Sequence, residues 1–183
     1  MNSSTTAAVV LCHPAGLVSP ALLYWLQDIG VQRRNVLFNP GNKWSWAVAM
    51  NDSCRRVCEL PEKIDTVIFA DADVRPSMRE TSPMIRRPYD VTCARCDLET
   101  GDKVWDDPHA FHTGLFILRR IVLHTLRGPW FEWSTNEDGS AMTGCGCASF
   151  AARVKAAGYT IGHAGRADHT PGPRAVNAPF VCR

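Results

Sequence analysis

The stretch Val67-Ile68-Phe69-Ala70-Asp71-Ala72-Asp73-Val74 joins four apolar residues to two carboxylates that stand two positions apart. An apolar run bounded by polar residues is typical of a strand buried on both faces of a sheet. Open α/β sheets bind their ligands at the carboxyl ends of such strands. Carboxylates there need a counter-charge, and oxygen ligands suit Mg²⁺ or Mn²⁺, which bind nucleotide phosphates. The stretch therefore predicts a metal and nucleotide site at the end of a central strand.

The residues before this strand alternate between strand and helix patterns. Strands are predicted over residues 7–12 and 35–38, and helices over 19–29 and 44–60. Ser19-Pro20 is a favourable start for the first helix, and Gly30 ends it. The apolar stripes of the two helices are expected to comprise Leu22, Leu23, Leu26 and Ile29, and then Ala47, Val48, Met50, Cys54, Val57 and Cys58. This alternation predicts an α/β fold with a parallel sheet.

The pattern after Asp73 is less regular. Residues 75–88 predict a loop or a short helix, 98–108 a turn-like region, and 134–144 a loop. Strands are expected over 89–94, 111–118 and 159–162, and helices over 119–126 and 148–157, with a tail from residue 166 along the surface. Gly114 marks a point of the 111–118 strand where a neighbour or ligand approaches closely.

Composition indicates one globular domain. The chain has 183 residues, 45% hydrophobic and 21% charged, and its net charge of +2 is too small to argue by itself for nucleic acid or membrane binding. No stretch approaches the ~20 apolar residues of a membrane span, and the first residues lack the features of a signal peptide. We expect a cytoplasmic protein whose eight cysteines are thiols or metal ligands.

The ordered set of motifs resembles the GT-A fold glycosyltransferases, especially the compact, family-2-like enzymes of bacteria and their viruses. The set covers roughly residues 9–169. It comprises the Asp71-Ala72-Asp73 strand, Thr113-Gly114-Leu115-Phe116, Pro129-Trp130-Phe131-Glu132-Trp133, Phe150-Ala151-Ala152-Arg153, Ala157-Gly158-Tyr159-Thr160-Ile161 and His169. The resemblance implies one GT-A-like domain over 1–183, with a mostly parallel central sheet flanked by helices. Its parts would be a nucleotide-sugar-binding half over 7–75, an acceptor half over 76–170 and a tail over 171–183.

The resemblance also implies a divalent metal held against the diphosphate of a sugar nucleotide, most simply a UDP-sugar. Asp73 would be a direct ligand of Mn²⁺ or Mg²⁺, Asp71 would contact the metal or the ribose, and His169 would complete the coordination. Asn51 matches the second residue of an Arg-Asn pair that contacts the nucleotide, although Met50 replaces the arginine. Arg75, directly after the metal strand, is a further candidate for contact with the nucleotide sugar.

The family's general base is not at its usual place. Members carry a Glu-Asp pair shortly before the phenylalanine that matches Phe150, and here Gly146 and Cys147 stand there. The hypothesis is that Glu137 or Asp138 takes the proton from the acceptor hydroxyl. A retaining mechanism and a catalytically weak protein are the alternatives.

Three further groups have two interpretations each. Trp130, Phe131 and Trp133 either stack on the acceptor, together with Gly114 nearby, or form an aromatic corner of the core. The four cysteines Cys93, Cys96, Cys145 and Cys147 either form a structural Zn²⁺ site or are free core thiols. The arginines Arg75, Arg79, Arg86 and Arg87 form either a solvated loop or a phosphate-facing one.

The predicted function is metal-dependent transfer of a sugar, as by a hexosyltransferase, from a nucleotide diphosphate to an acceptor hydroxyl. The basic loop makes modified bases of viral DNA one candidate acceptor. The alternatives are a nucleotidyltransferase, which would want a Gly-rich basic loop after the first strand, and a zinc-stabilised binding module derived from a transferase.

Overall fold

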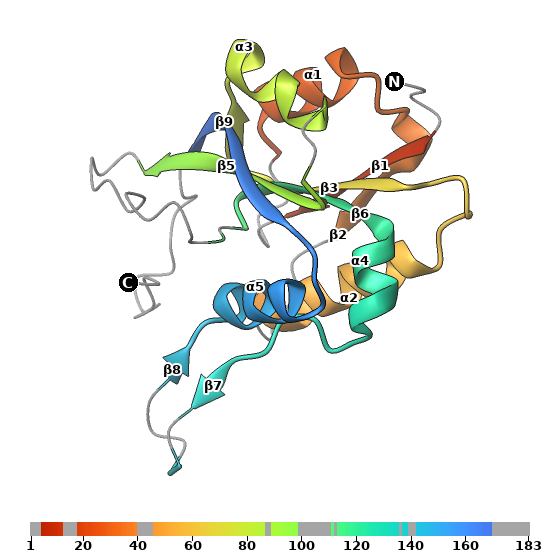
Figure 1. Ribbon diagram of the computed structural model, residues 1–183. Coiled ribbons are helices and arrows are strands. Elements are labelled where there is room, and N and C mark those ends of the chain that lie inside the picture. The colour runs from red at the N-terminus through yellow and green to blue at the C-terminus, as the bar shows by residue number, and fades with distance from the viewer. Residues whose placement is uncertain are drawn as a thin grey trace.

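The computed structural model describes residues 5–12, 18–39, 46–86, 89–98, 111, 113–135, 137–138 and 142–169. Within them, a seven-stranded sheet has the strand order β2-β1-β3-β6-β5-β9-β4, and a separate hairpin pairs β7 with β8. The sheet lies between two helical layers, with α1 and α3 on one face and α2, α4 and α5 on the other (Figure 1). The predicted α/β class, a single domain with a central sheet flanked by helices, is confirmed.

The strands are β1 (Thr6–Leu11), β2 (Val36–Asn39), β3 (Thr66–Asp71), β4 (Val74–Pro76), β5 (Val91–Leu98), β6 (Leu115–Arg119), β7 (Ser134–Thr135), β8 (Met142–Gly144) and β9 (Ile161–His169). The α-helices are α1 (Pro20–Asp28), α2 (Trp46–Cys58), α3 (Met78–Thr81), α4 (Arg120–Leu126) and α5 (Gly146–Ala156). Two 3₁₀ turns, η2 (Arg33–Asn35) and η3 (Ser82–Arg86), complete the described elements.

The two halves of the sheet differ in strand direction. β1 pairs in parallel with β2 and with β3, as the alternating sequence pattern predicts. In the other half β5 and β9 are parallel, whereas β6 runs antiparallel to both β3 and β5, and β4 runs antiparallel to β9. β3 already pairs with β1 on one side and with β6 on the other, and β4 joins the sheet at its far edge, beside β9.

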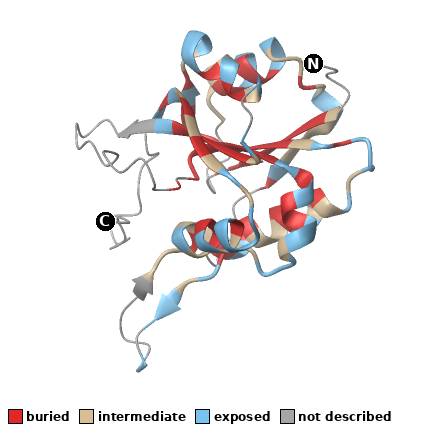
Figure 2. Ribbon diagram, viewed as in Figure 1, coloured by how far each residue is buried: buried red, intermediate tan, exposed pale blue. Residues whose placement is uncertain are grey.

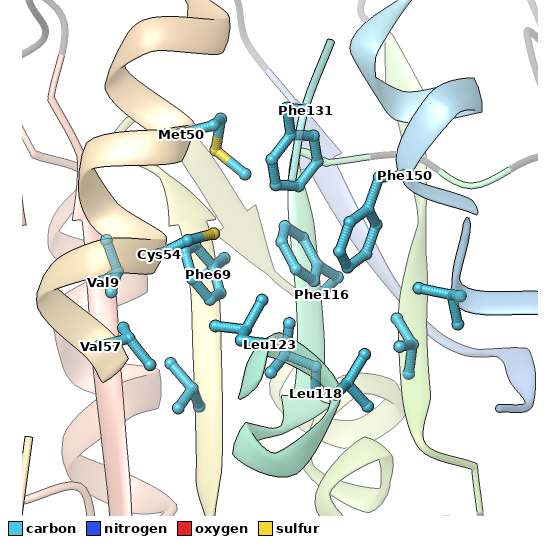
Figure 3. Packing of buried hydrophobic residues seen from close by; sticks show 14 of the residues in the cluster. Val9, Met50, Cys54, Val57, Phe69, Phe116, Leu118, Leu123, Phe131 and Phe150 are labelled. Atoms are coloured by element: carbon cyan, nitrogen blue, oxygen red, sulfur yellow. The ribbon is translucent and has the colours of Figure 1, made fainter. Parts of the chain in front are cut away.

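The larger core lies between the sheet and the α2, α4 and α5 layer. Aromatic rings fill its centre: Phe69 and Phe116 stack with centroids 4.8 Å apart, and Phe131 and Phe150 stack at 4.6 Å (Figure 3). Met50, Cys54 and Val57 of α2 are fully buried against this cluster. Cys54 is completely buried and is therefore a core residue, as its place on the helix predicts, and this burial raises the pKa of its thiol well above the usual value.

The second core lies under α1. Leu22 and Leu26 are buried as predicted, but Leu23 is 42% exposed and Trp25, which the predicted stripe omits, is completely buried. On α2, similarly, Val48 is 45% exposed although it was expected to face inward. Apolar content alone does not fix the buried arc of a short helix, because the face is decided by the sheet that the helix covers (Figure 2).

Several elements differ from the sequence expectation. Residues 75 and 76, expected in a loop or short helix, belong to β4, and β5 continues beyond residue 94 to Leu98. The predicted loop over 134–144 contains the β7–β8 hairpin, and the predicted four-residue strand over 159–162 continues to His169 as β9. Residues 166–169 are therefore strand and not tail, because β5 and β4 pair with them on either side. Of the expected turn region over 98–108, Leu98 is the last residue of β5 and the rest lies outside the described residues, as does the tail from residue 170. In the described part of the chain, no helix combines the length and apolar character needed to cross a bilayer.

Candidate functional site

The Asp71-Ala72-Asp73 segment leaves the sheet at the carboxyl end of β3. Asp71 is the last residue of β3 and pairs with Leu11 of β1, while its backbone N–H donates to the Gly114 carbonyl at 2.9 Å. Ala72 is held on both sides, since its N–H donates to Leu11 and its carbonyl accepts from Ser19 N–H at 2.6 Å. Both aspartates are partly exposed. The backbone of the acidic turn is thus fixed, and both of its aspartates keep part of their surface exposed.

The backbone brings His169 to the same edge. β4 begins at Val74, directly after Asp73, and Val74 is the Cα partner of His169 in the antiparallel β4–β9 ladder. His169 is at the same time the partner of Leu98 at the end of β5. His169, which is far from Asp71 and Asp73 in the chain, therefore shares one edge of the sheet with them.

Gly114 and its neighbours form the other side of this edge. Gly114 and Thr113 are buried just before β6, and the Thr113 hydroxyl lies 3.6 Å from Cys147 Sγ in the first turn of α5. The sequence predicts a role for Gly114 but not this contact of Thr113 with Cys147. The only signal for Thr113 was its place in the Thr113-Gly114-Leu115-Phe116 motif.

The positions expected to carry the acidic pair are packed against other side chains. A Cβ placed on Gly146 would lie 3.0 Å from the Trp46 ring and 3.4 Å from Phe131 Cβ, and Cys147 is engaged with Thr113. Trp46 meets Phe131 edge to face at 5.3 Å. A side chain at position 146 would press on the Trp46 ring, which would have to give way by a few tenths of an ångström, so the local packing favours a small residue here.

Glu137 and Asp138 are both exposed between β7 and β8. This hairpin extends away from the body of the domain, below α5 in Figure 1. The assignment of either residue as the general base stays a prediction, and it requires an acceptor that reaches the hairpin.

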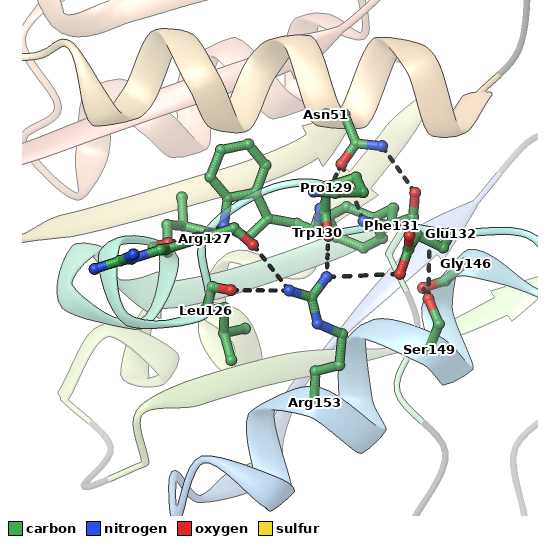
Figure 4. Close-up of polar contacts among 11 residues, drawn as sticks. Asn51, Leu126, Arg127, Pro129, Trp130, Phe131, Glu132, Gly146, Ser149 and Arg153 are labelled. Carbon is green, nitrogen blue, oxygen red and sulfur yellow. Dashed lines mark hydrogen bonds and ion pairs between the residues drawn. The ribbon is translucent and has the colours of Figure 1, made fainter.

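Asn51 anchors the loop that follows α4. Its side-chain amide accepts from the Trp130 and Phe131 N–H groups at 2.7 and 3.0 Å and donates to the Phe131 carbonyl at 2.8 Å (Figure 4). Only one amide hydrogen of Asn51 is outside these bonds. Asn51 therefore braces the backbone of residues 130 and 131. The nucleotide contact that the resemblance implies for Asn51 stays a prediction.

Arg153 of α5 braces the same loop from the other side. Its guanidinium donates to the carbonyls of Leu126 and Arg127, each at 2.8 Å, and to that of Pro129 (Figure 4). The Glu132 carboxylate is 3.8 Å from it. Together Asn51 and Arg153 join α2, α4 and α5 through one loop.

The tryptophans proposed to contact the acceptor lie partly buried against the larger core. Trp130 Nε1 donates to the Leu123 carbonyl at 2.9 Å, and Trp133 meets Trp46 edge to face at 6.2 Å. Phe131, at 1% exposure, belongs to the core. The aromatic-corner interpretation is correct for Phe131, whereas Trp130 and Trp133 keep part of their surface exposed.

The basic residues that follow β3 are spread over three elements. Arg75 on β4, Arg79 on α3 and Arg86 on η3 are exposed, and Arg87 lies outside the described residues. Arg75 is opposite Asp168 in the β4–β9 ladder.

Cysteines do not assemble a metal centre within the described residues. No group of three or more His, Cys, Asp or Glu side chains there could hold a metal ion, and this includes Cys93, Cys145 and Cys147. Cys93 is buried in the larger core and Cys147 packs against Thr113. The side chains of Cys96 and His169 lie outside the described set. The interpretation as core thiols therefore fits Cys93.

The donor set Asp71, Asp73 and His169 fits a divalent cation chemically. Carboxylate oxygens and an imidazole suit Mn²⁺ or Mg²⁺ better than a thiolate-seeking metal. The backbone register that unites the three residues is the structural observation that supports this fit.

Comparisons with known proteins support the fold. No protein-family model matches the chain, and no curated protein matches its sequence. The crystal structure of A197 from STIV is similar, with a TM-score of 0.57 and 17% identity, over 90% of this chain and 81% of that one. The catalytic domain of Drosophila β1,4-galactosyltransferase 7 in complex with xylobiose has a TM-score of 0.49 and a sequence identity of 12%. The match covers 86% of this chain and 64% of that one. The D211N mutant of that enzyme, in complex with manganese, UDP-Gal and xylobiose, has a TM-score of 0.47 and a sequence identity of 14%, with the same coverage of both chains.

Proposed function

We propose that this protein is a metal-dependent glycosyltransferase that moves a sugar from a nucleotide-diphosphate sugar, a UDP-sugar in the first instance, to an acceptor hydroxyl. The observation that carries the proposal is the meeting of Asp71, Asp73 and His169 at one sheet edge, through the end of β3 and the Val74–His169 pairing. This is the arrangement that the resemblance to GT-A enzymes implies for the metal and the diphosphate.

The residues of this edge have complementary tasks in the proposal. Asp73 and His169 would hold Mn²⁺ or Mg²⁺, and Asp71 would contact the metal or the ribose. When bound, the cation would neutralise the charge that develops on the leaving diphosphate. Arg75, exposed one residue after Val74, would add positive charge near the phosphates. Hydrogen bonds to the Gly114, Leu11 and Ser19 backbones fix the backbone of the acidic turn, so this backbone would need little reorganisation on binding.

The acceptor side is built from the partly exposed faces of Trp130 and Trp133 and from Gly114. Glu137 or Asp138 on the β7–β8 hairpin would act as the general base. The exposed arginines Arg75, Arg79 and Arg86 would suit an anionic acceptor such as a modified base in DNA.

Two other functions use the same edge of the sheet. A nucleotidyltransferase would also need two acids and a metal, but the first strand is followed by His13-Pro14-Ala15-Gly16, which is not a Gly-rich basic loop. A non-catalytic binding module is favoured by one observation, the packing of Gly146 and Cys147 at the positions where family members carry acids.

The deciding experiment incubates the purified protein and its Asp73→Ala variant with a panel of UDP-sugars and Mn²⁺, and measures release of UDP. Turnover that disappears in the variant supports the transferase. Release of pyrophosphate from a nucleoside triphosphate and a sugar phosphate would indicate nucleotidyl transfer. Binding of a UDP-sugar without any turnover would indicate a non-catalytic binding module.

A further inference from the structure

We infer that Gly165 and Thr81 are positioning residues for the proposed metal site, because together they set the register in which β9 delivers His169. The inference rests on the proposed function and adds to it two residues outside the metal ligands. It comes from an irregularity in β9, four residues before His169.

The irregularity is a β-bulge. β5 and β9 pair in parallel with Cys93 opposite His163, and then with Arg95 opposite Arg166. One residue of β5, Ala94, therefore faces two residues of β9, Ala164 and Gly165. A bulge exchanges the faces of all residues that follow it. The exchange is visible in the packing, since Ile161 contacts the larger core whereas Ala167, an even number of residues later, is completely buried in the core under α1.

Gly165 is required at this bulge for two reasons. Its φ of +78° lies in the left-handed region that side chains disfavour. A Cβ added to it would also lie 2.8 Å from Thr81 Cα and 2.9 Å from Met84 Cγ and Sδ. α3 and η3 therefore fit directly against the bulge, and Cα of Thr81 is backbone that cannot move aside cheaply.

Thr81 fastens the residue that follows the bulge. The Thr81 side chain is completely buried. Its hydroxyl donates to the Arg166 carbonyl and accepts from the Arg166 N–H at 3.3 Å, and Ser77 N–H donates to the same carbonyl at 2.9 Å. From Arg166 the strand continues as Ala167, Asp168 and His169, which pair with Pro76, Arg75 and Val74. The clamp on Arg166 thus fixes the register in which His169 lies opposite Val74, next to Asp73.

The test measures Mn²⁺ binding, without and with UDP, and the electron spin echo modulation that a histidine nitrogen produces when it coordinates Mn²⁺. His169→Ala identifies the nitrogen signal that belongs to His169. Gly165→Ala and Thr81→Val probe the bulge and the clamp, and circular dichroism establishes that each variant is folded. Gly158→Ala is the matched control, because Gly158 has a similar φ of +82° but nothing within 4 Å of an added Cβ.

The expected result is that Gly165→Ala and Thr81→Val lose the His169 nitrogen signal and bind Mn²⁺ about tenfold or more weakly, while Gly158→Ala behaves as the unaltered protein. If Thr81→Val is folded and retains both the His169 nitrogen signal and the Mn²⁺ affinity, the inference is overturned. If Gly165→Ala does not fold, the result for Thr81→Val decides the inference alone. Equal losses in Gly158→Ala overturn it too. If the unaltered protein binds no Mn²⁺, or if its signal survives His169→Ala, the metal site of the proposed function fails, and this inference fails with it.

Discussion

Val74 and His169 are Cα partners in the antiparallel ladder between β4 and β9, although they are far apart in the chain. Because Val74 follows Asp73 directly, this pairing joins the acidic end of β3 to the last residue of β9. The site therefore depends on two ladders between strands that are distant in the chain, β1 with β3 and β4 with β9.

Neutralising Asp73 should remove the proposed activity. Asp73→Asn keeps the size of the side chain but removes the charge, so we expect sugar-nucleotide turnover to fall by about 100-fold or more and Mn²⁺ affinity to fall with it. Turnover is measured as UDP release and affinity by calorimetry. Asp65→Asn is the control, since Asp65 is exposed before the opposite end of the same strand. Turnover that survives Asp73→Asn would contradict the metal role of this residue.

The general base is tested by Glu137→Gln, Asp138→Asn and the double variant. If one of the two carboxylates takes the proton of the acceptor, transfer should fall by about 10²–10⁴-fold, whereas affinity for the UDP-sugar should not change. The comparison of transfer rate with donor affinity separates a base from a donor-binding residue. An unchanged transfer rate in the double variant would exclude both residues.

Removing the Asn51 amide should destabilise the whole domain. Asn51→Ala leaves the Trp130 and Phe131 N–H groups and the Phe131 carbonyl without their partner. We expect the free energy of unfolding in urea to fall by about 2–4 kcal/mol. The neighbouring change Asp52→Asn should cost less than about 1 kcal/mol, because it breaks only an exposed ion pair with Arg55. Similar losses in the two variants would contradict the bracing role.

Replacing Arg153 by lysine should also destabilise the protein although the charge is kept. The planar guanidinium reaches the carbonyls of Leu126, Arg127 and Pro129 at once, and a single ammonium group cannot reproduce that fork. A loss of about 1.5–3 kcal/mol is expected in the same urea assay. Lys155→Arg, at an exposed position of the same helix, serves as the control and should be close to neutral.

Asp90 should make stability depend on pH in the acid range. The Thr160 backbone N–H, followed by the Thr160 hydroxyl and Arg119, holds the pKa of the Asp90 carboxyl below its usual value, against a smaller opposing effect of burial. The contribution of the ionised Asp90 carboxylate to the free energy of unfolding is present in full above the unfolded-state pKa of about 3.9. It is lost as the pH falls through the lower folded-state pKa. Asp90→Asn should therefore lower stability at pH 6 and change it little at pH 2. Glu62→Gln, on an exposed turn, should leave the pH profile as it is.

Local sequence determined the first half of the fold. The apolar run before Asp71 is long enough to specify a buried strand without knowledge of its neighbours, and the regular helix spacing of residues 46–58 predicts α2. The order strand, helix, strand, helix, strand then leads to the parallel β2-β1-β3 unit. The acidic end of β3 was predicted on the same grounds, because the abrupt change from apolar to acidic residues lies within a few positions of the chain.

Tertiary structure decided the rest. Residues 162–169, Gly-His-Ala-Gly-Arg-Ala-Asp-His, have little intrinsic preference for a strand, and they form β9 because β5 and β4 supply hydrogen-bonding partners on both sides. The faces of Leu23 and Val48 depend on which layer each helix covers. The tight packing around Gly146 and the need for glycine at 165 arise from Trp46 and from Thr81, residues distant in sequence. Each of these features depends on contacts between remote segments, so only the folded chain contains the information that fixes them.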